Sequence, residues 1–396
     1  MAEARVFAAG SFVGRAAELE IFQSALDTTL RDGRGLTLFV RGEAGIGKTR
    51  LLHEFQRLAQ MAGFHHHGGQ VLDFGVGEGQ DAIGILLRGL LDLTPGAGHN
   101  QRTAAAQTAA EAGLTRPEQR LHLNDLLSLP QNPEEAVLYE AMDNEQRNRG
   151  RVDALVTLVK GLSKQALLLL EIENLHWAQP ALLDYLTALA VAAGDHRILL
   201  LLSSRVQGDP LEAAWYDGIA PAPARILDLK PLTTEEARDF IFDFEGVDRE
   251  RAAACIERSG GNPLFLEQLL RSPGGDDGAI IPGSVQSVVQ ARIDALPARD
   301  RAALQAASVL GQRFALDAMR HVMNDSAYQP DDLLHFNMIR RYEGAFQFYH
   351  ALFRDAVHGS FLTERRRNLH LRAADWFQDR DAVLYAEHLG AAASDR

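Results

Sequence analysis

The sequence lacks the features that mark several large classes of protein. It contains one cysteine, Cys255, so no intramolecular disulfide can form, and no Cys/His spacing is typical of a zinc site. No stretch approaches the roughly 18 consecutive apolar residues of a membrane span, and the N-terminus lacks the basic-then-apolar pattern of a signal peptide. We therefore expect a cytoplasmic chain with no membrane association, in which Cys255 is a small core residue.

An excess of positive charge is also missing. Lys and Arg number 40 against 53 Asp and Glu, so the formal net charge is −13. Such a chain is not expected to bind nucleic acid directly through phosphate neutralisation. The run Arg365-Arg366-Arg367 is the best local basic candidate, but short charge runs more often form the solvated face of a helix.

What the sequence does have is an alternation of buried strands and amphipathic helices. Hydrophobic residues make up 46% of the 396 residues, enough for two or three domains. Apolar runs predict four strands, at 36–41, 70–74, 166–172 and 197–203, and helical spacing follows at 50–58 and 180–193. This order predicts an α/β fold in which helices cover both faces of a parallel sheet.

A glycine-rich segment after the first strand matches the phosphate-binding pattern G-x-x-x-x-G-K-[ST] (the P-loop). The glycines let successive N–H groups face phosphates at the positive end of the following helix. Lys48 is expected to neutralise the β and γ phosphates, and Thr49 to place its hydroxyl on Mg²⁺. The pattern specifies a triphosphate but not the base. The candidate nucleotide-binding residues are Gly42, Glu43, Ala44, Gly45, Ile46, Gly47, Lys48, Thr49 and Arg50.

A second metal-binding element is expected at the end of a buried strand. The run 167–174 (LLLLEIEN) supplies Glu173 there, and we assign it to the Mg²⁺ shell together with Thr49. Glu171 points to the same side of the strand and is the alternative ligand. A purely structural role, in which both carboxylates are partly buried and hydrogen-bonded, stays open.

Composition changes predict the domain limits. We expect a P-loop core at 1–230 with a mostly helical insertion at about 76–150, a small helical lid at 231–275, a winged-helix-like domain at 280–377, and the start of a helical repeat at 378–396. The lid opens with a helix that Thr233 or Thr234 can cap, with Glu235 and Glu236 in its first turn.

Several segments together resemble a known family. They are 12–19 (FVGRAAEL), the P-loop, 172–180 (IENLHWAQP), 203–205 (SSR) and 260–267 (GGNPLFLE). They resemble the signal-transduction ATPases with numerous domains (STAND), within the wider AAA-type lineage, and among these the ATPase module of bacterial nucleotide-cyclase and LuxR-type regulators with tetratricopeptide repeats. The resemblance extends through 291–297 (ARIDALP), 307–314 (ASVLGQRF) and 349–355 (YHALFRD), and so covers about residues 12–377. It implies a regulatory switch with slow turnover, in which bound ATP or ADP sets the packing of the subdomains.

The resemblance also implies nucleotide contacts outside the P-loop. The segment Val13-Gly14-Arg15 would border the adenine or ribose, and Arg205 would sense the γ-phosphate from the end of the fourth strand. The candidate catalytic residues are Lys48, Glu173 and Arg205. Pro263 would cover the base from the lid, and His350 would contact the nucleotide from the winged-helix domain. Ordinary roles stay open for these residues: a strand-end arginine, a helix-start turn and a core histidine.

Two positions depart from the family pattern. Asn174 stands where family members usually have an acid, and Gln179 stands where they often have another. An amide cannot take a proton from the attacking water as a general base. The sequence therefore predicts impaired hydrolysis, although Glu171 or Glu43 could substitute.

The predicted function is an Mg·ATP-dependent regulatory switch, a weak ATPase at most. One alternative is an active ATPase that converts ATP to ADP and phosphate to reset a cyclase or transcriptional partner. The other is a non-enzymatic scaffold that bound nucleotide stabilises. In each case we expect protein partners, or cyclase, tetratricopeptide or DNA-binding domains outside this sequence, and a nucleotide-dependent oligomer is a family expectation.

Overall fold

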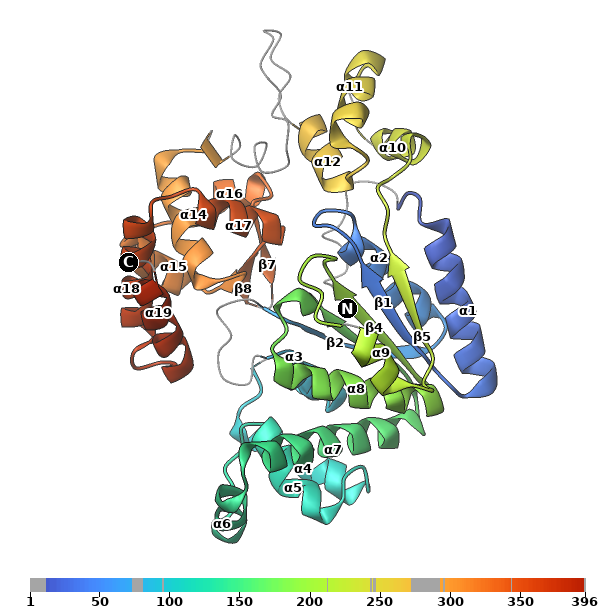
Figure 1. The fold of residues 1–396 in the computed structure, drawn as a ribbon. Helices are drawn as coiled ribbons and strands as arrows, with labels where there is room; N and C mark the ends of the chain where they lie inside the picture. Colours follow the sequence, from blue (N-terminus) through green and yellow to red (C-terminus); the bar gives the residue numbers. More distant parts are fainter. Residues whose placement is uncertain are drawn as a thin grey trace. The chain divides into compact units, whose positions relative to one another are not determined.

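The computed structural model describes residues 12–72, 81–94, 96–211, 213–242, 244, 247–271, 293–294, 296–342 and 344–394 (Figure 1). They form two compact units. One contains Ala17–Arg41 and Leu52–Asp228, and the other contains the described parts of Met1–Ala16, Gly42–Leu51 and Leu229–Arg396. The predicted limits at 275 and 280 lie outside these residues. Within the same described ranges, no helix is long and apolar enough to cross a membrane.

The first unit is built on a five-stranded parallel sheet with the order β2-β3-β4-β1-β5. The strands are β1 (Thr37–Arg41), β2 (Phe64–Gln70), β3 (Leu167–Glu173), β4 (Ile198–Ser204) and β5 (Ala224–Asp228). The helices are α1 (Ala16–Asp32), α2 (Lys48–Met61), α3 (Ala82–Leu90), α4 (His99–Glu111), α5 (Arg120–Leu126), α6 (Pro133–Ala141), α7 (Asn144–Ser163), α8 (Pro180–Asp195) and α9 (Ala213–Ile219), with short 3₁₀ turns at Pro117–Gln119 and Leu175–Trp177. The first residue of α1 and the first turn of α2 belong to the other unit. Because the strands are parallel, their carboxyl ends meet at one edge.

Helices cover both faces of this sheet, as predicted. In β3, Leu170 and Ile172 belong to a buried core that includes residues of α3, α7 and α8. On the opposite face Glu171 contacts Gln56 of α2. The sequence-based fold class, an α/β parallel sheet between layers of helices, is therefore confirmed.

The predicted position of the second strand is wrong. The strand is β2, Phe64–Gln70, while Val71 and Leu72 are irregular and residues 73–74 lie outside the described part of the chain. β2 is an edge strand, so it can be polar (FHHHGGQ) and carries little of the apolar signal of a central strand. Gly69 also allows close packing, because an added Cβ would lie 2.2 Å from the Ala82 carbonyl oxygen of α3.

The second unit contains a small helical region after β5. Its helices are α10 (Thr234–Ile241), α11 (Arg249–Ser259) and α12 (Pro263–Arg271). They share a core in which Cys255 is 2% exposed, as predicted for this residue. Thr233 caps α10, as the sequence indicated: its N–H donates to Glu236 Oε2 at 2.7 Å, and the Glu236 N–H donates to Thr233 Oγ1 at 3.2 Å.

The rest of the second unit combines helices with a small antiparallel sheet, and the winged-helix-like domain stays a prediction. The elements are α14 (Ala298–Leu310), β6 (Arg313–Phe314), α15 (Leu316–Met323), α16 (Asp331–His335), β7 (Ile339–Tyr342), β8 (Ala345–Phe348), α17 (Ala351–Gly359), α18 (Thr363–Phe377) and α19 (Ala382–Ser394). The three strands form an antiparallel sheet in the order β6-β8-β7. Phe314, Phe348 and Phe353 lie in its core.

Candidate functional site

Two glycines of the P-loop have a left-handed backbone conformation. Gly45 and Gly47 have φ angles of 79° and 101°, in the region that side chains other than glycine disfavour. Lys48 begins α2, and its Nζ donates to the carbonyl oxygens of Gly42 at 2.8 Å and Glu43 at 2.9 Å. The ammonium group therefore lies back along the loop at the positive end of a helix. These residues fit a polyphosphate, because they combine backbone N–H donors with a cation.

The turn before α12 is hydrogen-bonded to the P-loop. The side-chain Nδ2 of Asn262 donates to the Ala44 carbonyl oxygen at 3.0 Å, and the Leu264 N–H donates to the Gly45 carbonyl oxygen at 3.2 Å. The other side-chain atom, Asn262 Oδ1, accepts from the Phe265 N–H at 3.2 Å and caps α12. A Cβ on Gly45 would lie 2.8 Å from Leu264 Cβ, so glycine is needed for this approach.

Asn262 was not among the predicted site residues. An Asn directly before a Pro at the first helical position is a general helix-capping signal, and the sequence contains it. That signal accounts for the acceptor Oδ1. It does not show that the donor Nδ2 reaches a loop 218 residues earlier in the chain.

The segment Val13-Gly14-Arg15 lies against the same loop. The buried Arg15 side chain donates from Nη2 to the Ile46 carbonyl oxygen at 3.1 Å. Gly14 has a φ of 71°, and a Cβ there would lie 2.4 Å from Glu236 Oε1. The Thr233 N–H, helped by the Arg15 charge, holds the pKa of the Glu236 carboxyl below its usual value. The structure thus brings together three predicted parts, namely the N-terminal segment, the P-loop and the lid.

The two candidate carboxylates have different surroundings. Glu173 is the last residue of β3 and stands at the carboxyl edge of the sheet. Glu171 is 3% exposed, and its Oε2 accepts from Gln56 Nε2 at 2.8 Å and lies 3.1 Å from His66 Nε2. These contacts hold Glu171 inside the unit. The assignment of Glu173 to the Mg²⁺ shell stays a prediction.

Asn174 has a conformation that most residues avoid. Its φ and ψ are 62° and 42°, the left-handed region, and its N–H donates to Ser203 Oγ at 3.3 Å. Asn and Asp visit this region more easily than other residues with a side chain. Asn174 therefore fits the turn after β3, and an Asp would fit it as well.

Three residues that the family resemblance placed near the nucleotide have packing contacts of their own. Arg205 follows β4, and its guanidinium lies over the Trp177 ring, 5.6 Å from the centroid. Pro263 is the first residue of α12. The His350 ring lies 4.9 Å from the Tyr349 ring and 5.9 Å from the Phe353 ring. Their roles toward a nucleotide stay predictions.

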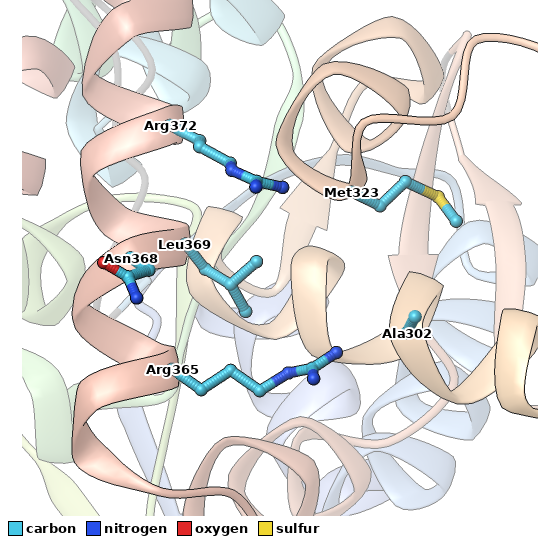
Figure 2. Close-up of a pocket in the computed structure, with 6 residues that line it drawn as sticks. All are labelled: Ala302, Met323, Arg365, Asn368, Leu369 and Arg372. Atoms are coloured by element: carbon cyan, nitrogen blue, oxygen red, sulfur yellow. The ribbon is translucent and has the colours of Figure 1, made fainter.

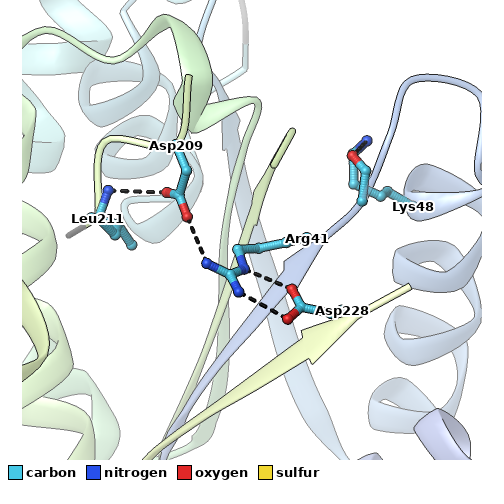
Figure 3. Close-up of polar contacts among 6 residues, drawn as sticks. Arg41, Lys48, Asp209, Leu211 and Asp228 are labelled. Atoms are coloured by element: carbon cyan, nitrogen blue, oxygen red, sulfur yellow. Dashed lines mark hydrogen bonds and ion pairs between the residues drawn. The ribbon is translucent and has the colours of Figure 1, made fainter. Parts of the chain in front are cut away.

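An ion network at the end of β1 was missed by sequence reasoning. Arg41 Nε and Nη2 donate to the two carboxylate oxygens of Asp228 at 2.7 and 2.9 Å, and Nη1 donates to Asp209 Oδ2 at 3.1 Å (Figure 3). The bond from Arg41 lowers the pKa of Asp228. Asp209 also accepts from the Leu211 N–H at 3.0 Å. No local signal reveals the network, because it depends on the register that sets Arg41 beside Asp228.

We expect Arg41→Gln to lower the free energy of unfolding by about 1–3 kcal/mol. Most of the loss should come from Asp209, whose side chain is 10% exposed and would lose its cationic partner, whereas that of Asp228 is 57% exposed. Urea denaturation checks this. The control is Arg31→Gln, which breaks a solvent-exposed pair with Asp32 and should have no measurable effect. Equal effects of the two changes would contradict a stabilising role for the network.

The chain is similar to several known proteins. Residues 11–202 match the family model of the AAA ATPase domain. An uncharacterized protein of Rhizobium meliloti (strain 1021) is 25% identical, over 92% of this chain and 36% of that protein. The solved structure of a STAND protein with a tetratricopeptide repeat sensor from Pyrococcus horikoshii shares the fold with a TM-score of 0.57 and 15% identity, over 97% of this chain and 48% of that one. Cdc6p from Pyrobaculum aerophilum gives a TM-score of 0.41 and 14% identity, over 88% of this chain and 96% of that one.

This chain therefore spans about a third of the length of its Rhizobium relative (36%) and about half of that of the Pyrococcus protein (48%).

Proposed function

We propose that the chain acts as an ATP-dependent regulatory switch, supported by the match of residues 11–202 to the model of the AAA ATPase domain. The observation that carries the proposal is the set of hydrogen bonds on the P-loop. The carbonyl oxygens of three consecutive loop residues, 44–46, accept bonds from Asn262, Leu264 and Arg15. The loop that would hold phosphates is thus bonded to the lid and to the N-terminal segment.

The geometry of the peptide unit couples the two sides of the loop. A peptide is planar, so the carbonyl of one residue and the N–H of the next move together. The peptide plane of the Ala44 carbonyl therefore carries the Gly45 N–H, which would face the phosphates. The plane of the Gly45 carbonyl carries the Ile46 N–H, which donates to the Glu43 carbonyl oxygen at 3.3 Å within the loop. Any rotation of these planes when phosphates bind or leave would change the bonds to Asn262 and Leu264. The lid would then read the state of the nucleotide.

The chain's own residues supply the proposed contacts to Mg·ATP. Lys48 would neutralise the β and γ phosphates. Thr49 and Glu173 would hold Mg²⁺, which would neutralise further negative charge on the phosphates. By family resemblance, the remaining contacts would come from Val13, Gly14, Arg15, Arg205, Pro263 and His350.

We propose that hydrolysis by this chain is slow or absent. Asn174 follows Glu173 at the carboxyl end of β3, where an acid would take the proton of the attacking water. Its amide can orient water through a hydrogen bond but cannot act as a base at neutral pH. Bound ATP would then persist, and the output of the switch would be conformational. The relatives are longer than this chain, and a protein partner or a further domain would receive that output.

The switch is tested by Asn262→Asp, which keeps the oxygen that caps α12 but removes the donor to the Ala44 carbonyl. Hydrogen exchange of residues 249–271 is compared without nucleotide, with Mg·ADP and with Mg·ATP. We expect exchange in the unaltered chain to differ between nucleotide states by about tenfold or more, because one hydrogen bond is worth on the order of 1 kcal/mol and two are involved. In Asn262→Asp the difference should become clearly smaller while nucleotide still binds, because only the bond from the Leu264 N–H remains.

The matched control is Asp248→Asn. Asp248 caps α11 by accepting from the Arg251 N–H at 2.8 Å. The side-chain oxygen of an Asn at this position can accept the same bond. The control should keep the nucleotide-dependent exchange. Equal exchange in all nucleotide states of the unaltered chain would instead support a scaffold that nucleotide merely stabilises.

A further inference from the structure

Helix α18 directs two arginines into a small cavity of the second unit. The cavity has a volume of about 290 Å³ and is lined by Ala302 of α14, Met323 of α15, and Arg365, Asn368, Leu369 and Arg372 of α18 (Figure 2). The volume is near the lower end of the range of small-molecule sites, roughly 300 Å³. The lining is apolar at Ala302, Met323 and Leu369, and its polar groups all come from α18.

The spacing of the two arginines sets the geometry of the cavity. Arg365 and Arg372 are seven residues apart, two helical turns, which corresponds to about 10 Å along the axis. Both side chains extend from α18 to the side on which Leu369 lies between them (Figure 2). Arg372 is held in place, because its Nη1 donates to the Val322 carbonyl oxygen at 3.2 Å. The cavity therefore has a cation toward each end and an apolar middle.

Two acidic groups near the cavity are paired elsewhere, and Glu364, beside Arg365 on α18, does not line it. No carboxylate lines the cavity, and among the described residues neither Arg365 nor Arg372 forms an ion pair. Asp375, close to Arg372 on α18, contacts His321 Nε2 at 2.9 Å. Asp325, after α15, binds Arg299 at 2.7 Å. In a chain with a net charge of −13, two arginines that converge without acidic partners point to an anionic ligand.

We propose that this cavity binds a small organic dianion, with a carboxylate or phosphate group at each end and an apolar segment over Leu369. A guanidinium can donate two parallel hydrogen bonds to either group, so one arginine can hold each end. Asn368, between the arginines, can bond to a polar substituent. The ligand would bridge α18 to α14 and α15, and so would stabilise the packing of these helices by mass action.

The same arrangement disfavours a nucleic-acid surface at the arginine run. Arg366 is directed away from the cavity, because its Nη1 donates to the His358 carbonyl oxygen at 3.3 Å. Arg367, which is exposed as Arg365 and Arg372 are, does not line the cavity. The three consecutive arginines therefore do not form one continuous basic surface, and the run predicted as the best basic candidate is divided among different contacts.

Calorimetric titration of the full chain, saturated with Mg·ATP to occupy the P-loop, tests the proposal. The probes are linear dicarboxylates from succinate to suberate and 1,6-hexanediol bisphosphate, which separate the carboxylate and phosphate sources. Two compounds serve as controls: acetate, which carries only one negative charge, and 1,6-hexanediol, which carries none. We expect at least one dianion to bind with 1:1 stoichiometry, to raise the melting temperature, and to weaken as salt increases.

Arg365→Gln and Arg372→Gln should each weaken this binding about tenfold or more, because each removes a charge-assisted contact. Arg367→Gln removes the same charge from the same helix outside the cavity and should leave affinity unchanged. Arg365 makes no bond to a neighbouring helix among the described residues, so Arg365→Gln keeps the test valid if Arg372→Gln loosens the fold.

Three results would overturn the proposal. In the first, no dianion binds at concentrations up to tens of millimolar. In the second, Arg367→Gln weakens binding as much as Arg365→Gln, which would mean diffuse attraction to the whole helix. In the third, a single-stranded oligonucleotide binds and depends on all three arginines of the run while the dianions do not, which would assign the region to nucleic acid.

Discussion

Replacing Asn174 by Asp is expected to raise the rate of ATP hydrolysis by about 10² to 10⁴-fold, the usual contribution of a general base. The new carboxylate would accept the proton of the attacking water beside Glu173. Asp tolerates the left-handed conformation of residue 174 (φ 62°), so the turn after β3 should keep its shape. Phosphate release and chromatography of the bound nucleotide measure the effect: mostly intact ATP on the unaltered chain, mostly ADP on the variant.

Two controls make this result specific. Asn174→Gly keeps the left-handed turn without adding a base and should stay slow. Lys48→Ala combined with Asn174→Asp should lose phosphate release, because the gained activity must come from the P-loop. If the unaltered chain releases phosphate as fast as Asn174→Asp, then another residue, such as Glu171 or Glu43, supplies the base, and our interpretation of Asn174 is wrong.

The second large effect is expected on acidification, at a buried histidine pair. The Nδ1 atoms of His370 in α18 and His388 in α19 lie 3.0 Å apart, and the residues are 3% and 0% exposed. The His388 ring stacks on Phe377, with 5.4 Å between centroids, and the His358 ring lies 6.1 Å from that of His370. Two imidazolium ions at this distance in an apolar setting would repel each other strongly.

The pH range follows from the pKa of His388. Burial, and next the neighbouring His370, lower it to about 3 in the folded chain. An unfolded histidine titrates near pH 6.5, so the stabilising contribution of the neutral ring is complete above about pH 6.5. It is lost as the pH falls toward 3, by up to roughly 1.4 kcal/mol per pH unit. We therefore expect α18 and α19 to separate in acid.

Urea denaturation at pH 7, 6 and 5, followed by the fluorescence of Trp376 in α18, measures this loss. His388→Gln, which can still exchange a hydrogen bond with His370, should remove most of the pH dependence. His99→Gln changes an exposed histidine of α4 and should leave it unaltered. A decline of the same steepness in all three chains would assign the acid sensitivity to other groups.

The parts of the site that the sequence predicted are short and continuous. The P-loop pattern lies within eight residues and has one structural solution between a strand and a helix, so Gly42 to Thr49 could be assigned directly. Central strands such as β3 and β4 could also be predicted, because a strand that is buried on both faces consists of a nearly continuous apolar run. Thr233 and Glu236 follow a capping rule that spans only three residues.

The parts that were missed depend on pairing across the chain. β2 was misplaced because an edge strand needs few apolar residues, and the more apolar segment that follows it attracted the prediction. The Arg41 network requires the register between β1 and β5. The contact of Asn262 with Ala44 joins residues 218 positions apart, and neither has a composition that marks the contact. These features are set by tertiary packing, which no local pattern encodes.

The hydrogen bonds between the lid and the P-loop also determine which substitutions are tolerated where the two segments meet. On the loop side they use backbone carbonyls of residues 44 and 45, which any amino acid offers. A change of side chain at position 44 therefore leaves the acceptor in place. On the lid side one of the two donors is an Asn side chain. Only positions 262 and 45 therefore require a particular amino acid. If residues 44, 45 and 262 are randomised together and functional variants are selected, Asn262 and Gly45 should be retained, whereas many amino acids should be accepted at position 44.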